Sequence, residues 1–312
     1  MRLPDFLVIG GYKCGSTSLH EYLRAHPDIF VPERKEPNYL AFDGADPTGP
    51  ETLNPAWARS VQTLPDYAAL FESAPANALL GEVSPEYLTH PLAAERIAAR
   101  LPDVKLVAVL RDPVRRAFSD FCMNLRDGRE PESEFAAALD DQDRRAAAHQ
   151  ANGFYLSTGF YGEQLQRYFR HFPAHQIHVM LAEDLRKDRD ATLRALYGFL
   201  GVRDVPNVVD GTEHNRSGVP SNPAAAAAYR LRNGVGRRIG PLVPTSLKRR
   251  IDDLLQRGLA TPEFRAADQA RLADVYRADV APPPVDDRPG PRRLARRSEH
   301  HRALDETGDS DR

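Results

Sequence analysis

A glycine-containing turn near the N-terminus is the first place where the residue types suit chemistry. The stretch FLVIGGYKCGSTSL, which starts at Phe6, joins a hydrophobic run to a segment that opens with Ser16, Thr17 and Ser18. When a strand enters a helix through such a turn, free backbone N–H groups gather at the positive end of the helix and form an anion site. The sequence therefore predicts a phosphate-binding loop at this turn.

The lysine of this loop stands at an unusual position. The spacing Gly10-x4-Gly15 is that of a Walker A loop, but Ser16 follows the second glycine, where a nucleotide triphosphatase carries lysine. The lysine here is Lys13, two residues before that glycine. This displacement predicts a phosphate cradle that does something other than hold a β,γ-phosphate with magnesium. A P-loop kinase that uses ATP and magnesium remains an open alternative.

An arginine after a strand-like run is the second candidate. The stretch KLVAVLRDPVRRAFS, residues 105–119, places Arg111 at the carboxyl end of an apolar run, where open α/β sheets bind ligands. A guanidinium suits a bidentate grip on phosphate, although for Arg111 alone a salt bridge is the favoured interpretation. Pro113 marks the first turn of a helix, and Ser119 lies roughly two turns into it. Together with the first loop, Arg111 predicts a second phosphate ligand.

Hydrophobic patterning predicts the elements that position these residues. Strand-length apolar runs without polar alternation, typical of buried parallel strands, lie at residues 6–9, 78–80, 104–110 and 177–181. Apolar residues three and four apart predict helices at residues 17–25, 92–101, 114–125, 160–172 and 191–200. Strands that alternate with helices predict an α/β fold, a P-loop-type doubly wound parallel sheet flanked by helices in a single domain.

Four segments depart from this alternation. Residues 43–65 are rich in Pro, Gly, Asp and Thr and predict a long surface loop. Residues 126–150 predict a charged helical excursion whose apolar stripe is Phe135, Ala138 and Leu139. The Lys/Arg-rich part of residues 230–250 fits a solvated helical face or a basic patch that faces the acceptor. Residues 282–312 have almost no apolar side chains, so we expect a domain over 1–281 and a disordered polar tail.

Composition argues against several classes of protein. The 42 Lys and Arg nearly balance the 44 Asp and Glu, so no global field favours nucleic acid as a partner. The two cysteines, Cys14 and Cys122, are far apart in the sequence and do not indicate a disulfide framework. The sequence contains no CxxC, no HExxH and no cluster of His, Asp and Glu, so it predicts no metal site. The apolar runs are far shorter than the about 20 residues of a membrane span, and the first strand begins near Asp5 without a signal peptide before it. We expect a cytoplasmic protein without metal or membrane partner, of a size that fits one large domain.

Several spaced motifs resemble those of the sulfotransferases that use 3′-phosphoadenylyl sulfate (PAPS). The chain is most similar to the heparan-sulfate-type branch and its bacterial relatives over about Pro4 to Val280. Besides the Lys13 loop and the Arg111 and Ser119 pair, the resemblance rests on HPD at 26, KEPNY at 35, EVSPEY at 82, GFYGEQLQRY at 159, EDL at 183 and FLGV at 199. It implies transfer of a sulfuryl group from PAPS to a hydroxyl or amine, with no metal required.

The resemblance also implies roles for single residues. Lys13 would stabilise charge on the bridging oxygen as its bond to sulfur breaks, and Glu36 would deprotonate the acceptor. Arg111 and Ser119 would hold the 3′-phosphate, while the backbone amides of the first loop would hold the 5′-phosphate side. The residues implied in donor binding are Lys13, Cys14, Gly15, Ser16, Thr17, Ser18, Arg111, Ser119, Tyr161, Arg216, Ser217 and Gly218.

Departures from the family pattern bear on the acceptor. Val83 stands where the heparan-sulfating branch usually has lysine, so we expect a carbohydrate or small natural-product acceptor more than a long anionic polysaccharide. Glu82, at a strand end, is either a second carboxylate near the acceptor or part of a structural salt bridge. On composition alone Glu36 is an exposed glutamate in a charged loop, and only the resemblance makes it a base. A non-catalytic nucleotide-binding protein with the same fold is a further alternative.

Overall fold

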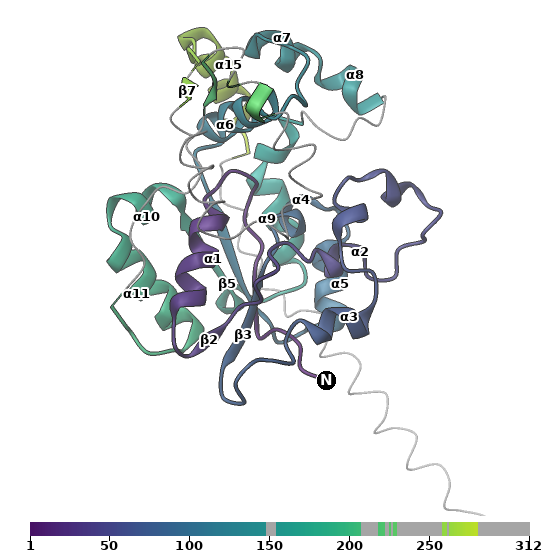
Figure 1. Ribbon diagram of the computed structural model, residues 1–312, viewed down its shortest axis with the longest axis vertical. Helices are drawn as coiled ribbons and strands as arrows, with labels where there is room; N and C mark the ends of the chain where they lie inside the picture. Colours follow the sequence, from purple (N-terminus) through teal and green to yellow (C-terminus); the bar gives the residue numbers. More distant parts are fainter. Residues whose placement is uncertain are drawn as a thin grey trace, which may run out of the picture.

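The central element of the fold is a five-stranded parallel sheet (Figure 1). The computed structural model describes residues 1–147, 154–206, 218–221, 225, 227–229, 258–260 and 262–279. The strands lie in the order β2-β3-β1-β4-β5 and are β1 Phe6–Val8, β2 Ile29–Phe30, β3 Leu79–Val83, β4 Lys105–Leu110 and β5 Ile177–Leu181. β1 lies between β3 and β4, with Phe6 opposite Gly81 on one side and Lys105 on the other. This arrangement confirms the predicted α/β class with a parallel sheet.

Each face of the sheet has its own hydrophobic core. Successive side chains of a strand point to opposite faces, so Phe6 and Val8 pack on one face while Leu7 and Ile9 pack on the other. The first core is covered by α1 Ser16–Ala25, α10 Ala182–Lys187 and α11 Arg189–Leu200. The second is covered by α2 Tyr39–Phe42, α3 Leu64–Ala69, α4 Glu86–Thr89, α5 Ala93–Arg100 and α9 Tyr161–Phe169. Burial on both faces explains why these strands read as continuous apolar runs.

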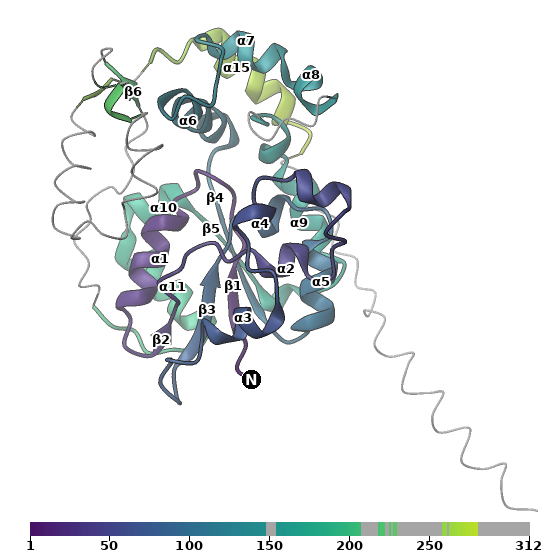
Figure 2. The ribbon, with the colours of Figure 1, turned by 45° about the vertical axis from the view of Figure 1, so that its right-hand side comes forward.

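A separate group of helices lies beyond the carboxyl ends of the strands (Figure 2). It consists of α6 Pro113–Arg126, α7 Phe135–Asp140, α8 Gln142–Ala147 and α15 Ala266–Tyr276. The core that α6, α7 and α15 share is aromatic: the rings of Phe118 and Phe264 stack with centroids 4.2 Å apart. Phe135, Ala138 and Leu139 are buried there, which confirms the predicted apolar stripe of the helical excursion. This group places α6 above the predicted phosphate loop.

Short elements complete the described structure. They are the 3₁₀ turns Pro50–Leu53, Trp57–Arg59, Ser157–Gly159 and Ala174–Gln176 and the antiparallel pair β6 Val219–Pro220 and β7 Leu259–Ala260. Within the described ranges, no helix combines the length and the apolar character that crossing a bilayer requires.

The segment 43–65 differs from the prediction of a plain surface loop. It contains two 3₁₀ turns, and the Trp57 ring meets Phe42 edge-on at 5.4 Å between centroids. The Glu51 carboxylate accepts two hydrogen bonds, of 2.8 and 2.9 Å, from Arg96 on α5. These contacts with distant residues fix the segment although its own composition favours turns. The basic stretch 230–250 and the tail 282–312 lie outside the described residues, so the domain boundary stays a prediction.

Candidate active site

The predicted phosphate loop connects β1 to α1 at the carboxyl edge of the sheet. A side chain at Gly10 would lie 2.2 Å from Val109 Cγ1, so only glycine lets β1 leave the sheet this close to β4. Lys13 (φ 67°) and Gly15 (φ 89°) both have left-handed backbone, which turns the chain into the helix. Among the described side chains none caps the N-terminus of α1, and its first turn holds no acidic residue. The positive end of the helix is therefore available to an anion.

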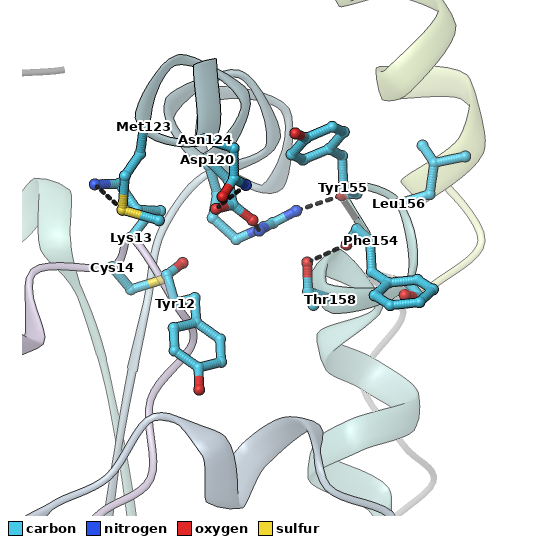
Figure 3. Close-up of polar contacts among 12 residues, drawn as sticks. Tyr12, Lys13, Cys14, Asp120, Met123, Asn124, Phe154, Tyr155, Leu156 and Thr158 are labelled. Carbon is cyan, nitrogen blue, oxygen red and sulfur yellow. Dashed lines mark hydrogen bonds and ion pairs between the residues drawn. The ribbon is translucent and has the colours of Figure 1, made fainter. Parts of the chain in front are cut away.

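Lys13 points from the loop toward α6 (Figure 3). Its Nζ lies 3.5 Å from Sδ of Met123. Burial lowers the pKa of Lys13 from 10.5 to about 8; Asp120 opposes this shift, and Arg126 and Arg111 add to it. The loop thus holds an ammonium whose charge is destabilised by burial, and an anionic ligand would stabilise its charged form.

Arg111 comes to the same loop from the end of β4. Its Nη1 donates a 3.2 Å hydrogen bond to the Lys13 carbonyl, and burial followed by the charge of Arg186 lowers its pKa. Asp112 caps α6, because its carboxylate accepts hydrogen bonds from the backbone N–H groups of Val114 (2.8 Å) and Arg115 (3.1 Å). Ser119 is buried further along this helix. The structure therefore brings Arg111 to the loop, as the sequence predicts.

Tyr161 supports the loop from the first turn of α9. Its hydroxyl lies 3.4 Å from Sγ of Cys14, and the Cys14 thiol is fully buried with a pKa raised to about 11 by that burial. Asp279 accepts hydrogen bonds from the N–H groups of Gly162 (2.8 Å) and Glu163 (3.0 Å), so the chain after α15 caps α9. The Cys14 N–H donates to the Gly11 carbonyl at 3.3 Å and its side chain is buried, so Cys14 holds the loop in shape.

Lys35 connects Glu36 to the loop. The Lys35 ammonium donates hydrogen bonds to Oγ of Ser16 (3.2 Å) and Oγ1 of Thr17 (2.9 Å), and it lies 3.2 Å from Oε1 of Glu36. The Glu36 N–H donates to the carbonyl of Val83 at the end of β3, at 3.0 Å. The backbone of Glu36 is thereby fixed to the end of β3, and the Lys35 side chain alone connects its carboxylate to the hydroxyls of Ser16 and Thr17 through the contacts given above.

Glu86 is a second carboxylate beside this site that sequence reasoning missed. Its two oxygens accept 2.6 Å hydrogen bonds from the Tyr12 hydroxyl and from the side-chain amide of Asn54. Burial raises the pKa of Glu86, and the nearby negative charge of Glu36 raises it further. The EVSPEY motif marks this region in the sequence, and it contains two glutamates, Glu82 and Glu86. The motif alone does not show which of the two lies near Glu36.

Glu82, the other glutamate of that motif, is buried in the core instead. Only 1% of it is exposed, and burial raises its pKa to about 8, with the hydroxyls of Tyr87, Tyr67 and Ser84 opposing the shift. Within the part of the chain that the structure describes, no cation pairs with it. The described residues thus offer Glu82 no salt bridge, and its place in the core separates it from Glu86 beside the site.

Comparison with known proteins identifies the family. Residues 4–206 match the profile described as the sulfotransferase family. The chain belongs to the sulfotransferase family. The predicted resemblance is thus confirmed, and this membership favours sulfuryl transfer over the kinase alternative.

The similar sulfotransferases include animal and bacterial proteins. The mouse heparan sulfate glucosamine 3-O-sulfotransferase 3B1 is 31% identical over 206 residues, which are 65% of this chain and 47% of the mouse enzyme. The human heparan sulfate glucosamine 3-O-sulfotransferase 6 is 29% identical over 257 residues, 81% of this chain and 68% of the human enzyme. The match thus spans about half the length of the mouse relative. The crystal structure of a sulfotransferase from Alicyclobacillus acidocaldarius is 28% identical, with a TM-score of 0.61, over 86% of this chain and all of that chain.

Of the remaining predicted site residues, the structure describes Ser18 and Gly218 but not Arg216 and Ser217. Ser18 is half-buried in the first turn of α1 beside Thr17, as the loop requires. Gly218 precedes β6, where a side chain would come within 2.9 Å of Leu259 Cβ. Arg216 and Ser217 lie outside the described residues, so the late donor-binding loop stays a prediction. Among the residues described, no three His, Cys, Asp or Glu side chains gather as metal ligands would.

Proposed function

We propose that this protein transfers a sulfuryl group from PAPS to a hydroxyl or amine of a carbohydrate or small-molecule acceptor. The observation that carries the proposal is the position of Glu36 beside the phosphate loop, joined to Ser16 and Thr17 by the single ammonium of Lys35. A carboxylate next to an anion cradle is the arrangement that base-assisted transfer from a phosphate-anchored donor requires. Family membership supplies the reaction class.

The cationic loop would hold the donor. The free amides at the start of α1 suit the 5′-phosphate side, and Arg111 with Ser119 suits the 3′-phosphate that distinguishes PAPS from ATP. Burial lowers the pKa values of Lys13 and Arg111, so the donor phosphates would stabilise two cations that water solvates poorly. Tyr161 would line the pocket from below the loop, next to Cys14.

The transfer would proceed in line. Glu36 accepts the proton of the acceptor hydroxyl while that oxygen attacks the sulfur, and the bond from sulfur to the bridging phosphate oxygen breaks. The products are the sulfated acceptor and adenosine 3′,5′-bisphosphate. Lys13, once turned from Met123 toward the donor, would neutralise the charge that develops on the bridging oxygen. Proton removal by a positioned carboxylate contributes about 10²–10⁴-fold to such a rate.

The acceptor side of the site is mixed in charge. Glu86 and Tyr12 lie close enough to Glu36 for its charge to raise the pKa of both. Glu36, next to the buried Glu86, gives this side of the site an anionic group that a polyanion would meet, and like charges repel. We therefore propose a weakly charged carbohydrate or small natural product as acceptor, although the mouse and human relatives are named for heparan sulfate. We also keep the prediction that the protein acts in the cytoplasm.

Calorimetric titration with adenosine 3′,5′-bisphosphate, beside ATP with magnesium, tests the donor. Micromolar binding of the bisphosphate, without matching binding of ATP, is the expected result. Tight binding of ATP without binding of the bisphosphate would overturn the proposal and favour the kinase alternative. Bisphosphate binding without any transfer from PAPS across an acceptor screen would favour the non-catalytic alternative.

A further inference from the structure

The ammonium of Lys35 occupies the space between the phosphate loop and Glu36. An ammonium has three N–H donors, and here the acceptors in reach are Ser16 Oγ, Thr17 Oγ1 and Glu36 Oε1, at 3.2, 2.9 and 3.2 Å. Only 22% of the Lys35 side chain is exposed. A long, flexible side chain that is mostly buried and contacts three acceptors has a defined position and is not a solvated surface charge.

The backbone that presents Lys35 and Glu36 is held in a costly conformation. Glu36 (φ 59°) and Asn38 (φ 52°) are both left-handed, a region that side chains other than glycine rarely adopt. Two contacts fix the turn to the end of β3: the Glu36 N–H donates to Val83, and the Asn38 N–H donates to Oγ of Ser84 at 3.3 Å. Such conformations persist where the surroundings enforce them, commonly at functional sites.

Lys13 cannot fill the same place in this structure. Its ammonium points toward α6, where it lies 3.5 Å from Sδ of Met123 (Figure 3). Among the described lysines, Lys35 alone therefore contacts both the hydroxyls of Ser16 and Thr17 and the carboxylate of Glu36. In an in-line transfer, the migrating group lies between the phosphate end of the donor and the base.

We propose that Lys35 is a second cation of the donor site, which binds the sulfuryl group of PAPS rather than its phosphates. The inference rests on the proposed function. A sulfuryl group brings anionic oxygens next to Glu36, which must itself be anionic to accept a proton, and these like charges repel. The ammonium of Lys35, placed between them, hydrogen-bonds the sulfuryl oxygens, offsets this repulsion and stabilises the charge that spreads over those oxygens during transfer.

Two nucleotides that differ only in the sulfuryl group test this role. Binding of PAPS and of adenosine 3′,5′-bisphosphate is measured by calorimetry, without acceptor, for the full-length wild type, Lys35→Ala and Lys35→Arg. We expect Lys35→Ala to weaken PAPS binding about tenfold, the fold-change of one charged hydrogen bond. Binding of the bisphosphate should change less than about twofold, and Lys35→Arg should restore part of the PAPS affinity.

Arg34→Ala is the matched control, because it removes a neighbouring positive charge whose guanidinium donates instead to the Arg59 carbonyl, at 2.8 Å. It should leave the affinities for both nucleotides unchanged. If Lys35→Ala lowers the affinities for both nucleotides equally, Lys35 only stabilises the loop, and the inference is wrong. If neither affinity changes, Lys35 does not contact the donor, and the inference is also wrong. A wild type that binds neither nucleotide would instead refute the proposed function. Lys35→Gln serves if the alanine variant fails to fold.

Discussion

Nη1 of Arg111 donates a 3.2 Å hydrogen bond to the backbone carbonyl of Lys13, so the end of β4 is tied to the phosphate loop that follows β1. The two residues are 98 positions apart in the chain and come together because β1 and β4 are neighbours in a parallel sheet. Parallel strands end at one edge, and ligands of open α/β sheets bind there. The contact holds the Arg111 guanidinium against the phosphate loop, where the proposed donor would bind.

Replacement of Arg111 by alanine tests its assignment to the 3′-phosphate. We expect the affinity for adenosine 3′,5′-bisphosphate to fall by about 2–5 kcal/mol, the range for loss of one buried charged partner. The affinity for adenosine 5′-phosphate, which lacks the 3′-phosphate, should change little. Arg115→Ala is the control, since Arg115 lies nearby in the first turn of α6 with 71% of its side chain exposed. Equal loss of affinity for both nucleotides would contradict the assignment.

The pH dependence of nucleotide affinity reports on Lys13. The pKa of Lys13 is lowered from 10.5 to about 8 by burial, so above pH 8 the free protein loses this positive charge. An anionic ligand favours the ammonium, and binding above pH 8 must therefore take up a proton. We expect affinity for adenosine 3′,5′-bisphosphate to be level below pH 8 and to fall as the pH rises beyond it, by up to about tenfold per pH unit.

Lys13→Arg provides the comparison for this titration. An arginine keeps its charge at all the pH values concerned, so the variant should lose the fall in affinity between about pH 8 and 9.5. Titration calorimetry across this range measures the effect. A wild type and an arginine variant with parallel pH profiles would show that Lys13 is not the group that titrates.

Glu36→Gln separates proton transfer from donor binding. The amide keeps the size of the carboxylate but cannot accept the acceptor proton, so we expect turnover to fall by about 10²–10⁴-fold. Affinity for adenosine 3′,5′-bisphosphate should stay within about threefold of the wild type. Transfer of labelled sulfuryl from PAPS to an acceptor found by screening gives the rate. Glu33→Gln, an exposed glutamate three residues earlier, should have no effect; near-normal turnover of the Glu36 variant would refute its role as base.

The sheet and the phosphate loop could be predicted because their determinants are local. β1 and β4 are buried on both faces and read as apolar runs, and the glycines with the following hydroxyl residues mark the turn into α1. β2 escaped prediction because a pair of only two residues, Ile29 and Phe30, shows no periodicity. The helices at 17–25, 92–101, 114–125 and 191–200 were placed within a residue or two, while α9 ends at Phe169 instead of 172.

The second carboxylate could not be assigned from sequence. Glu82 and Glu86 lie four residues apart in one motif, and their different roles come from partners distant in the chain. Tyr12 and Asn54 bind Glu86, whereas Tyr67 and Tyr87 surround Glu82. The bridge from Lys35 to the loop depends equally on the left-handed backbone of Glu36, which no local residue pattern marks.

Glu82 should make the stability of the fold depend on pH. Its pKa is raised by burial from 4.5 to about 8, so between these values the folded state holds a proton that the unfolded state has lost. The stabilisation by the protonated carboxyl is full below pH 4.5 and falls as the pH rises toward 8, by up to about 1.4 kcal/mol per pH unit. Glu82→Gln, which mimics the neutral form, should unfold with a weaker dependence on pH.

Urea unfolding of the wild type and of Glu82→Gln at several pH values between about 5 and 8.5 measures this difference. Other titrating groups contribute equally to both proteins, so the difference between the two free energies of unfolding isolates Glu82. We expect the variant to gain on the wild type as the pH rises to about 8, because folding of the wild type must then take up a proton, whereas folding of the variant does not. Glu72→Gln, at an exposed position, should track the wild type throughout. A constant difference between wild type and Glu82→Gln would mean that Glu82 keeps one protonation state on folding.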